Sequence, residues 1–211
     1  MKKLVFKGFY KNEEQLPKGI LPSNAVKFKE VSPLGEIDAT IVLLFVSTLI
    51  FISLVLIGST AIHGSFNMRV SLGGVWLFFI ALLPHELLHY LAFGEGSVVE
   101  LYIAPKHLAL FVTSTTPMTK KRFIYISLLP NIVLGLIPCL AWMLLPYNEM
   151  YSDILITFSV MMLLAGIYDY YNAFNALHQM PRGSMHQLSG SSSYWFMPEK
   201  DPLESRDDNS I

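Results

Sequence analysis

The sequence has little cysteine and little charge. Its single cysteine, Cys139, can form no disulfide within the chain, and its place in an apolar run predicts a small buried side chain rather than a nucleophile. Charged residues make up only 15% of the chain, and the net charge is −1. Because nucleic-acid binding takes a basic excess, this balance excludes nucleic acid as an expected partner.

A long apolar stretch is also missing from the start of the chain. After Met1-Lys2-Lys3 come polar and mixed residues with several Pro and Gly, so a cleaved signal peptide is not expected. We expect residues 1–38 to form a cytoplasmic N-terminal arm. Residues 181–211 are expected to form a flexible cytoplasmic tail, because their later part is rich in Ser, Asp and Pro.

Apolar residues are abundant and make up 53% of the chain. Crossing a bilayer takes about 20 mainly apolar residues, and four segments qualify: about 39–62, 70–93, 123–145 and 152–177. Between the second and the third, residues 97–113 contain two stretches rich in Val, Leu, Tyr and Phe that predict a short β-hairpin. The sequence thus predicts an all-α membrane protein with about four transmembrane helices and this one hairpin, with residues 39–180 as its membrane domain.

Lys and Arg indicate how these segments are oriented. Fourteen of the fifteen lie in the N-terminal arm, between the second and third segments, or in the tail, and only Arg69 lies elsewhere. Since cytoplasmic connections carry the excess of Lys and Arg, we expect a multi-pass protein of the cell membrane with both termini in the cytoplasm.

The second segment contains the sequence His85-Glu86-Leu87-Leu88-His89, an HExxH motif. The i, i+4 spacing puts both imidazoles on one helical face, where they can share a metal ion. Glu86 is offset by one residue and can act as a general base on metal-bound water. Between Ser71 and Phe93 the motif holds the only His, Asp, Glu, Lys or Arg side chains. A charge near the bilayer centre costs about 2.5–3.5 kcal/mol, so such residues usually carry function.

Asp169 is the expected third ligand. From the outer face, His85 and His89 lie 15 to 19 residues along their segment, and Asp169 lies about 17 along the fourth, so all three reach a similar depth at 1.5 Å per residue. Two histidines and one carboxylate leave an open position for water on zinc. The alternative is that Asp169 only forms hydrogen bonds with nearby Tyr or Asn side chains.

Two asparagines are candidates for a supporting role. Asn131 lies near the same depth and is either a donor to a developing oxyanion or an amide that bridges helices. Asn172 follows Asp169 by three residues and shares its helical face, so it can orient that carboxylate or contact substrate. The remaining histidines are not expected to be ligands. His178 lies on the opposite helical face from Asp169, and solvated loop positions are expected for His63, His107 and His186.

Between about Gly73 and Gly183 the chain resembles the site-2 protease class of intramembrane zinc metalloproteases. It is more similar still to a family of small bacterial membrane proteins described as zincin peptidases. The resemblance rests on four stretches of the sequence: residues 84–89, 121–131, 166–169 and 180–183. It implies that His85, His89 and Asp169 bind Zn²⁺ and that Glu86 activates water. It also implies a three-helix core with a hairpin after the motif helix.

From these observations we expect a zinc-dependent metallopeptidase that hydrolyses peptide bonds of membrane proteins, within or beside the bilayer. The expected partners are a peptide or membrane-protein substrate and the lipid bilayer. The hairpin is expected either to clamp an extended substrate at its strand edge or only to plug the site. The alternative function is a non-catalytic zinc-bound adaptor or sensor, which would have no need of Glu86.

Overall fold

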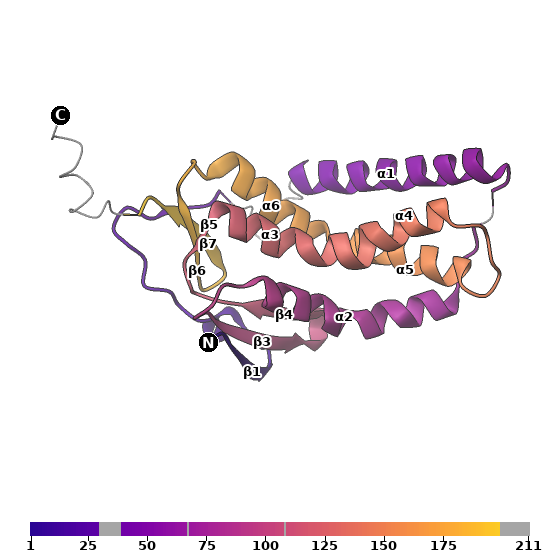
Figure 1. Cartoon of the computed structure of the whole chain (residues 1–211). Helices are drawn as coiled ribbons and strands as arrows, with labels where there is room; N and C mark the ends of the chain where they lie inside the picture. Colours follow the sequence, from indigo (N-terminus) through magenta and orange to yellow (C-terminus); the bar gives the residue numbers. More distant parts are fainter. Residues whose placement is uncertain (30–38, 67, 108, 199–211) are drawn as a thin grey trace, which may run out of the picture.

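The computed structural model describes residues 1–29, 39–66, 68–107 and 109–198. Its helices run roughly parallel in a bundle, and its strands gather toward one end of that bundle (Figure 1). The helical elements are α1 (Ala39–His63), α2 (Leu72–Ala92), α3 (Lys120–Pro130), η3 (Asn131–Leu136), α4 (Ile137–Leu144), α5 (Ser152–Ala165) and α6 (Ile167–Gln179), with short 3-10 turns η1 (Glu13–Gln15) and η2 (Pro105–His107). The strands are β1 (Lys3–Phe9), β2 (Val26–Lys27), β3 (Val98–Ala104), β4 (Ala109–Thr113), β5 (Met118–Thr119), β6 (Met185–Ser189) and β7 (Ser192–Phe196).

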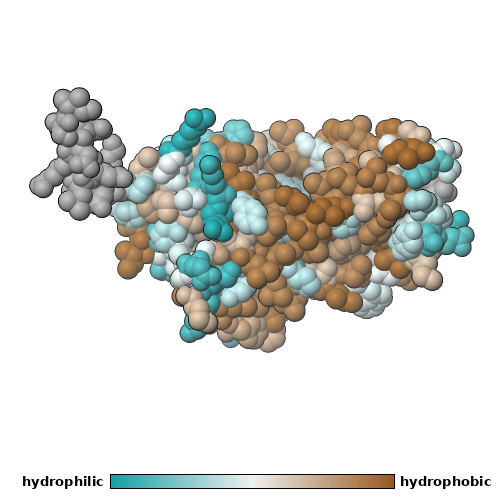
Figure 2. All heavy atoms as spheres, viewed as in Figure 1, coloured by the Kyte–Doolittle hydropathy of each residue, from teal (hydrophilic) through white to brown (hydrophobic). Residues whose placement is uncertain are grey.

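Three helices are long and apolar enough to cross a membrane: α1, α2 and the continuous run from α3 through α4. The pair α5 and α6 meets the same test only when taken together, and it is bent by 45° at Gly166. On the face shown in Figure 2, hydrophobic side chains cover most of the middle of the bundle, and hydrophilic side chains gather toward its two ends. This distribution is what a bilayer around the helices requires.

The helices pack closely around the middle of the bundle. α2 lies against α5, and a Cβ on Gly74 would come within 2.7 Å of the Ile154 carbonyl, so only glycine allows this approach. α1 lies outside this pair and packs against α4, α5 and α6. Its outward residues are exposed and apolar, among them Leu43, Ile50 and Leu54.

The strands form two sheets. In the first, with the order β1-β3-β4, β1 runs parallel to β3 and β3 runs antiparallel to β4. In the second, with the order β2-β7-β6-β5, all pairs are antiparallel. The first sheet therefore joins the chain's first residues to the hairpin after α2. The second joins β2 to the hairpin that follows α6.

The prediction of an all-α protein is wrong, because the fold is mixed and contains these two sheets of three and four strands. The sequence did indicate the hairpin of β3 and β4, but it gave no sign of β1, β2, β5, β6 and β7. β1 and β2 pair with strands that lie far away in the sequence, β5 has only two residues, and β6 and β7 have only five each, so local periodicity carries little trace of them. Within the expected arm and tail, residues 30–38 and 199–211 lie outside the described residues.

A hydrophobic core connects the sheets to the helices where α2, α3 and α6 end or begin. Its buried members include Phe28 after β2, Phe93 after α2, Val99 of β3, Phe123 of α3 and Met180 after α6. Arg122 adds a bond from α3 to α2 by donating from Nη1 to the Ala92 carbonyl at 3.0 Å. The last turns of α2 and the first turns of α3 are thereby fixed relative to both sheets.

Candidate metal centre

His85 and His89 lie one turn apart on α2 and point the same way. Their ring centroids are 4.9 Å apart with the planes nearly perpendicular, and the two Nε2 atoms are 3.2 Å apart. Pro84, within the same helix, has no amide proton to donate, which loosens the helical hydrogen bonding just before the motif. The i, i+4 spacing thus brings two imidazole nitrogens to one point on the inner face of α2.

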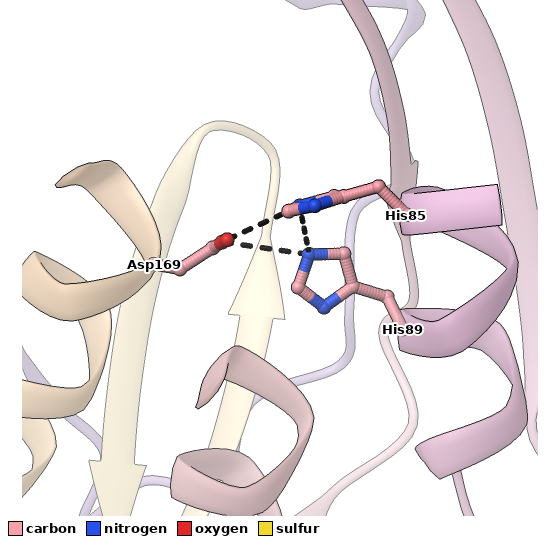
Figure 3. Close-up of side chains that lie close together, drawn as sticks. All are labelled: His85, His89 and Asp169. Carbon is pink, nitrogen blue, oxygen red and sulfur yellow. Dashed lines mark hydrogen bonds and ion pairs between the residues drawn. The ribbon is translucent and has the colours of Figure 1, made fainter. Parts of the chain in front are cut away.

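Asp169, in the first turn of α6, faces this point from across the bundle, as Figure 3 shows. Its Oδ2 is 3.2 Å from His85 Nε2, and its Oδ1 is 3.4 Å from His89 Nε2. A tetrahedral zinc ion with bonds of about 2.0–2.2 Å holds its ligand atoms about 3.3–3.6 Å apart. The three side chains therefore already have the spacing of a zinc site, and their ligand atoms all lie within 4.8 Å of one another.

Hydrogen bonds behind the cluster orient its members. His89 Nδ1 is 2.8 Å from the Ile126 carbonyl, which can only accept, so Nδ1 carries the proton and Nε2 turns a lone pair toward the cluster. Asn131 Nδ2 donates to Asp169 Oδ2 at 2.7 Å. Of the two roles expected for Asn131, this bond is the helix-bridging one, since it links the third segment of the bundle to α6.

Two irregularities in the helices make the Asn131 bond possible. Asn131 begins the π-helical turn η3, which separates α3 from α4, and Gly166 separates α5 from α6. A Cβ on Gly166 would collide with the side-chain amide of Asn131. Glycine at this break therefore leaves the space in which Asn131, only 2% exposed, lies against Asp169.

Replacing Gly166 by Ala should weaken zinc binding about 10- to 100-fold, the usual cost of losing a residue that orients a ligand. The added methyl group displaces Asn131 and so removes its hydrogen bond to Asp169. Competition with a chromophoric chelator would measure the affinity. Gly94→Ala is the matched control, because a Cβ there meets nothing within 4 Å. Equal zinc affinity in both variants would show that Asn131 does not orient Asp169.

Glu86 lies beside the cluster and is not part of it. Its carboxylate is buried, and Oε2 accepts a hydrogen bond from the backbone N–H of Val112 on β4 at 2.9 Å. Glu86, His89 and Asp169 line one cavity of about 200 Å³. The other lining residues come from the neighbouring helices and strands: Phe93, Phe111, Val112, Met118, Phe123, Ile126, Ser127, Asn172, His186 and Leu188. A buried carboxylate outside the cluster thus shares a cavity with two of the cluster's three side chains.

A family model with the description "Putative zincin peptidase" matches residues 77–185, which is just over half of the chain. The chain belongs to this zincin peptidase family. No curated protein and no solved structure matches the chain. The matched residues contain all three members of the cluster and Glu86, together with most of α2, the hairpin of β3 and β4, and the helices from α3 to α6.

Asn172 and the histidines that were not expected to be ligands fall in different places. Asn172 lines the cavity, although Asn131 and not Asn172 forms the bond to Asp169. His178 is exposed and stacks on Phe174, away from the cluster. His63 contacts the Met143 carbonyl at 3.1 Å. The side chain of His107 lies outside the described residues.

The prediction that His186 is a solvated loop histidine is wrong. It lies on β6 and is fully buried, with its ring stacked on Phe123 at 3.6 Å between centroids and edge-on to Phe28. Burial lowers the pKa of His186 to about 3, so the ring is neutral. The alternation of side chains along a strand could have indicated burial, but only if residues 185–189 had first been recognised as a strand.

Proposed function

We propose that this chain is a zinc-dependent peptidase that hydrolyses peptide bonds of membrane proteins, within or beside the bilayer. The observation that carries the proposal is the presence of Glu86 in the same cavity as a cluster with the spacing of a zinc site. A site that only held a structural ion would have no use for a buried carboxylate beside its ligands, whereas hydrolysis needs a base there.

The residues would divide the chemistry among them. His85, His89 and Asp169 would hold zinc, which when bound polarises the scissile carbonyl and lowers the pKa of a water molecule. Glu86 takes the proton from the attacking water and delivers it to the leaving amine, so it acts first as general base and then as general acid. The backbone N–H of Val112 donates its hydrogen bond to Oε2 of Glu86, which leaves Oε1 to take up this proton.

The edge of β4 offers a place for the substrate. Among the described strands, β4 has a neighbour only on its β3 side. The Val112 N–H points from the other side toward Glu86, so the open edge of the strand faces the cavity. A peptide added to such an edge gains main-chain hydrogen bonds whatever its side chains are. We therefore expect the bound scissile segment to be extended rather than helical.

Basic residues support placing the site toward the cytoplasmic face. Lys2 Nζ donates to the carbonyls of Leu91 and Phe93 at the end of α2, at 2.9 and 3.2 Å. Lys120 Nζ donates to the carbonyls of Leu177 and Met180 at the end of α6, at 3.0 and 2.7 Å. These cations lie at the end of the bundle nearer the cluster, and cations gather on the inner side of a membrane.

Single-span reporter proteins would test this function. Each reporter carries the same extended apolar segment next to its transmembrane helix, on either the inner or the outer face. Co-expression with this chain should produce cleavage of the inner-face reporters only, because the basic residues place the cluster nearer that face. Cleavage of purified reporters should stop with a zinc chelator and return with added zinc.

Cysteine labelling in the tail after residue 190 is the control for orientation, and it should occur only from the cytoplasmic side. Labelling from outside intact cells would reverse the proposed side of the site. Absence of cleavage in every reporter, combined with one bound zinc ion per chain, would favour the adaptor function instead.

A further inference from the structure

One hydrogen bond connects the expected catalytic base to a strand of the hairpin. The backbone N–H of Val112 donates to Glu86 Oε2 at 2.9 Å, and Glu86 is only 8% exposed. Val112 lies opposite Leu101 of β3, so an N–H that reaches Glu86 points away from β3. β4 and α2 pack against each other along this line.

This is an unusual use of the amide of an edge strand. Such amides normally face water or pair with another strand. Here the amide contacts a carboxylate that directly follows His85 in the sequence and lies three residues before His89. β4 is a rigid support, because it pairs with β3 over its whole length, from Ala109 to Thr113. A flexible glutamate side chain is therefore held by a donor whose position the sheet fixes.

We propose that Val112 is a positioning residue whose backbone N–H holds the Glu86 carboxylate at the reacting atoms, on the same strand edge that receives the substrate. The inference rests on the proposed function, because it concerns the base of that reaction. Leu110 has the same orientation as Val112, since residues two apart on a strand point the same way. The Val112 N–H already donates to Glu86, so an incoming peptide would form its main-chain hydrogen bonds with β4 at Leu110. One strand sets both the position of the base and the register of the substrate.

Val112→Pro tests this role, with Val112→Ala as its matched control. Proline removes the N–H but leaves the pairing with β3, which does not use that N–H. The proline variant should lose about 10- to 100-fold in kcat with KM within about twofold of wild type, since a misplaced catalytic group costs rate rather than binding. The alanine variant keeps the N–H, so its loss of kcat should be much smaller than that of the proline variant. Zinc content and thermal unfolding are measured for both.

Two other patterns of kcat and KM in these variants would overturn the proposal. If KM rises while kcat is unchanged, the Val112 amide binds substrate and does not hold the base. Equal losses of kcat in the alanine and proline variants would show that the side chain and not the N–H is responsible.

A second measurement does not depend on peptidase activity or on the proline variant folding. Hydrogen exchange of the Val112 amide should be about tenfold or more faster in Glu86→Ala than in the wild-type chain, both loaded with zinc. Unchanged exchange would remove the contact on which the proposal rests. If the wild-type chain has no peptidase activity but the exchange result holds, the proposed function fails while the contact between Glu86 and β4 stands.

Discussion

Replacing Glu86 by Gln should reduce peptide hydrolysis by 10²- to 10⁴-fold while zinc binding and the fold remain. Glutamine has nearly the same shape as glutamate and can still accept the hydrogen bond from Val112, so the packing between α2 and β4 is kept. It cannot take up a proton from water, and loss of a general base typically costs this much in rate. His85, His89 and Asp169 are untouched by the change.

Cells that express the Glu86→Gln variant allow this effect to be measured even while the natural substrate is unidentified. Membrane proteins that accumulate uncleaved with the variant, and not with the wild type, are candidate substrates for a purified assay. Wild-type turnover by the variant on a confirmed substrate would refute the proposed mechanism. If cells tolerate this variant but not the loss of a zinc ligand, the adaptor function becomes the better explanation.

Replacing His85 by Ala should lower zinc from about one ion per chain to near none, and hydrolysis should fall below detection. The cluster has three members among the described residues, so the change leaves one imidazole and one carboxylate, too few for a stable zinc site. Elemental analysis of the purified protein measures the ion directly.

His178→Ala is the matched control for this experiment. His178 is exposed and contacts Phe174 rather than the cluster, so its removal should leave the zinc content unchanged. Retention of a full zinc ion in the His85→Ala chain would show that the ion binds elsewhere. Loss of zinc in both variants would point to a general loss of structure.

The sequence was most informative where a local pattern determines the outcome. Apolar runs of the right length became α1, α2 and the run from α3 through α4, and the HExxH spacing brought two imidazoles to one helical face. The meeting with Asp169 followed from counting residues along two segments, because helical rise converts such counts into depth. Each of these inferences needs only the residues of one or two helical segments.

The sequence was least informative where distant segments decide the structure. Phe123 and Phe28 lie against His186 because β5, which precedes α3, pairs with β6, and because β2, which precedes Phe28, joins the same sheet through β7. β5 and β2 lie far from residue 186 in the sequence, so no periodicity near that residue reveals them. The Asn131 bond likewise depends on a π-helical turn and on Gly166, 35 positions further along the chain. Side-chain roles of this kind follow from tertiary contacts, which local propensity does not encode.

The pairing of β2 with β7 has a consequence for the order in which the molecule is completed during synthesis. β7 is the last strand of the described chain to be made, and it pairs with a segment made near the beginning, so the second sheet closes only after all the helices have been translated. β6, which contributes His186 and Leu188 to the cavity wall, is fixed in the same step. His85, His89 and Asp169 all precede residue 185, whereas this wall comes from the strand that begins there. The residues of the cluster are thus all translated before the strand that completes the cavity wall beside them.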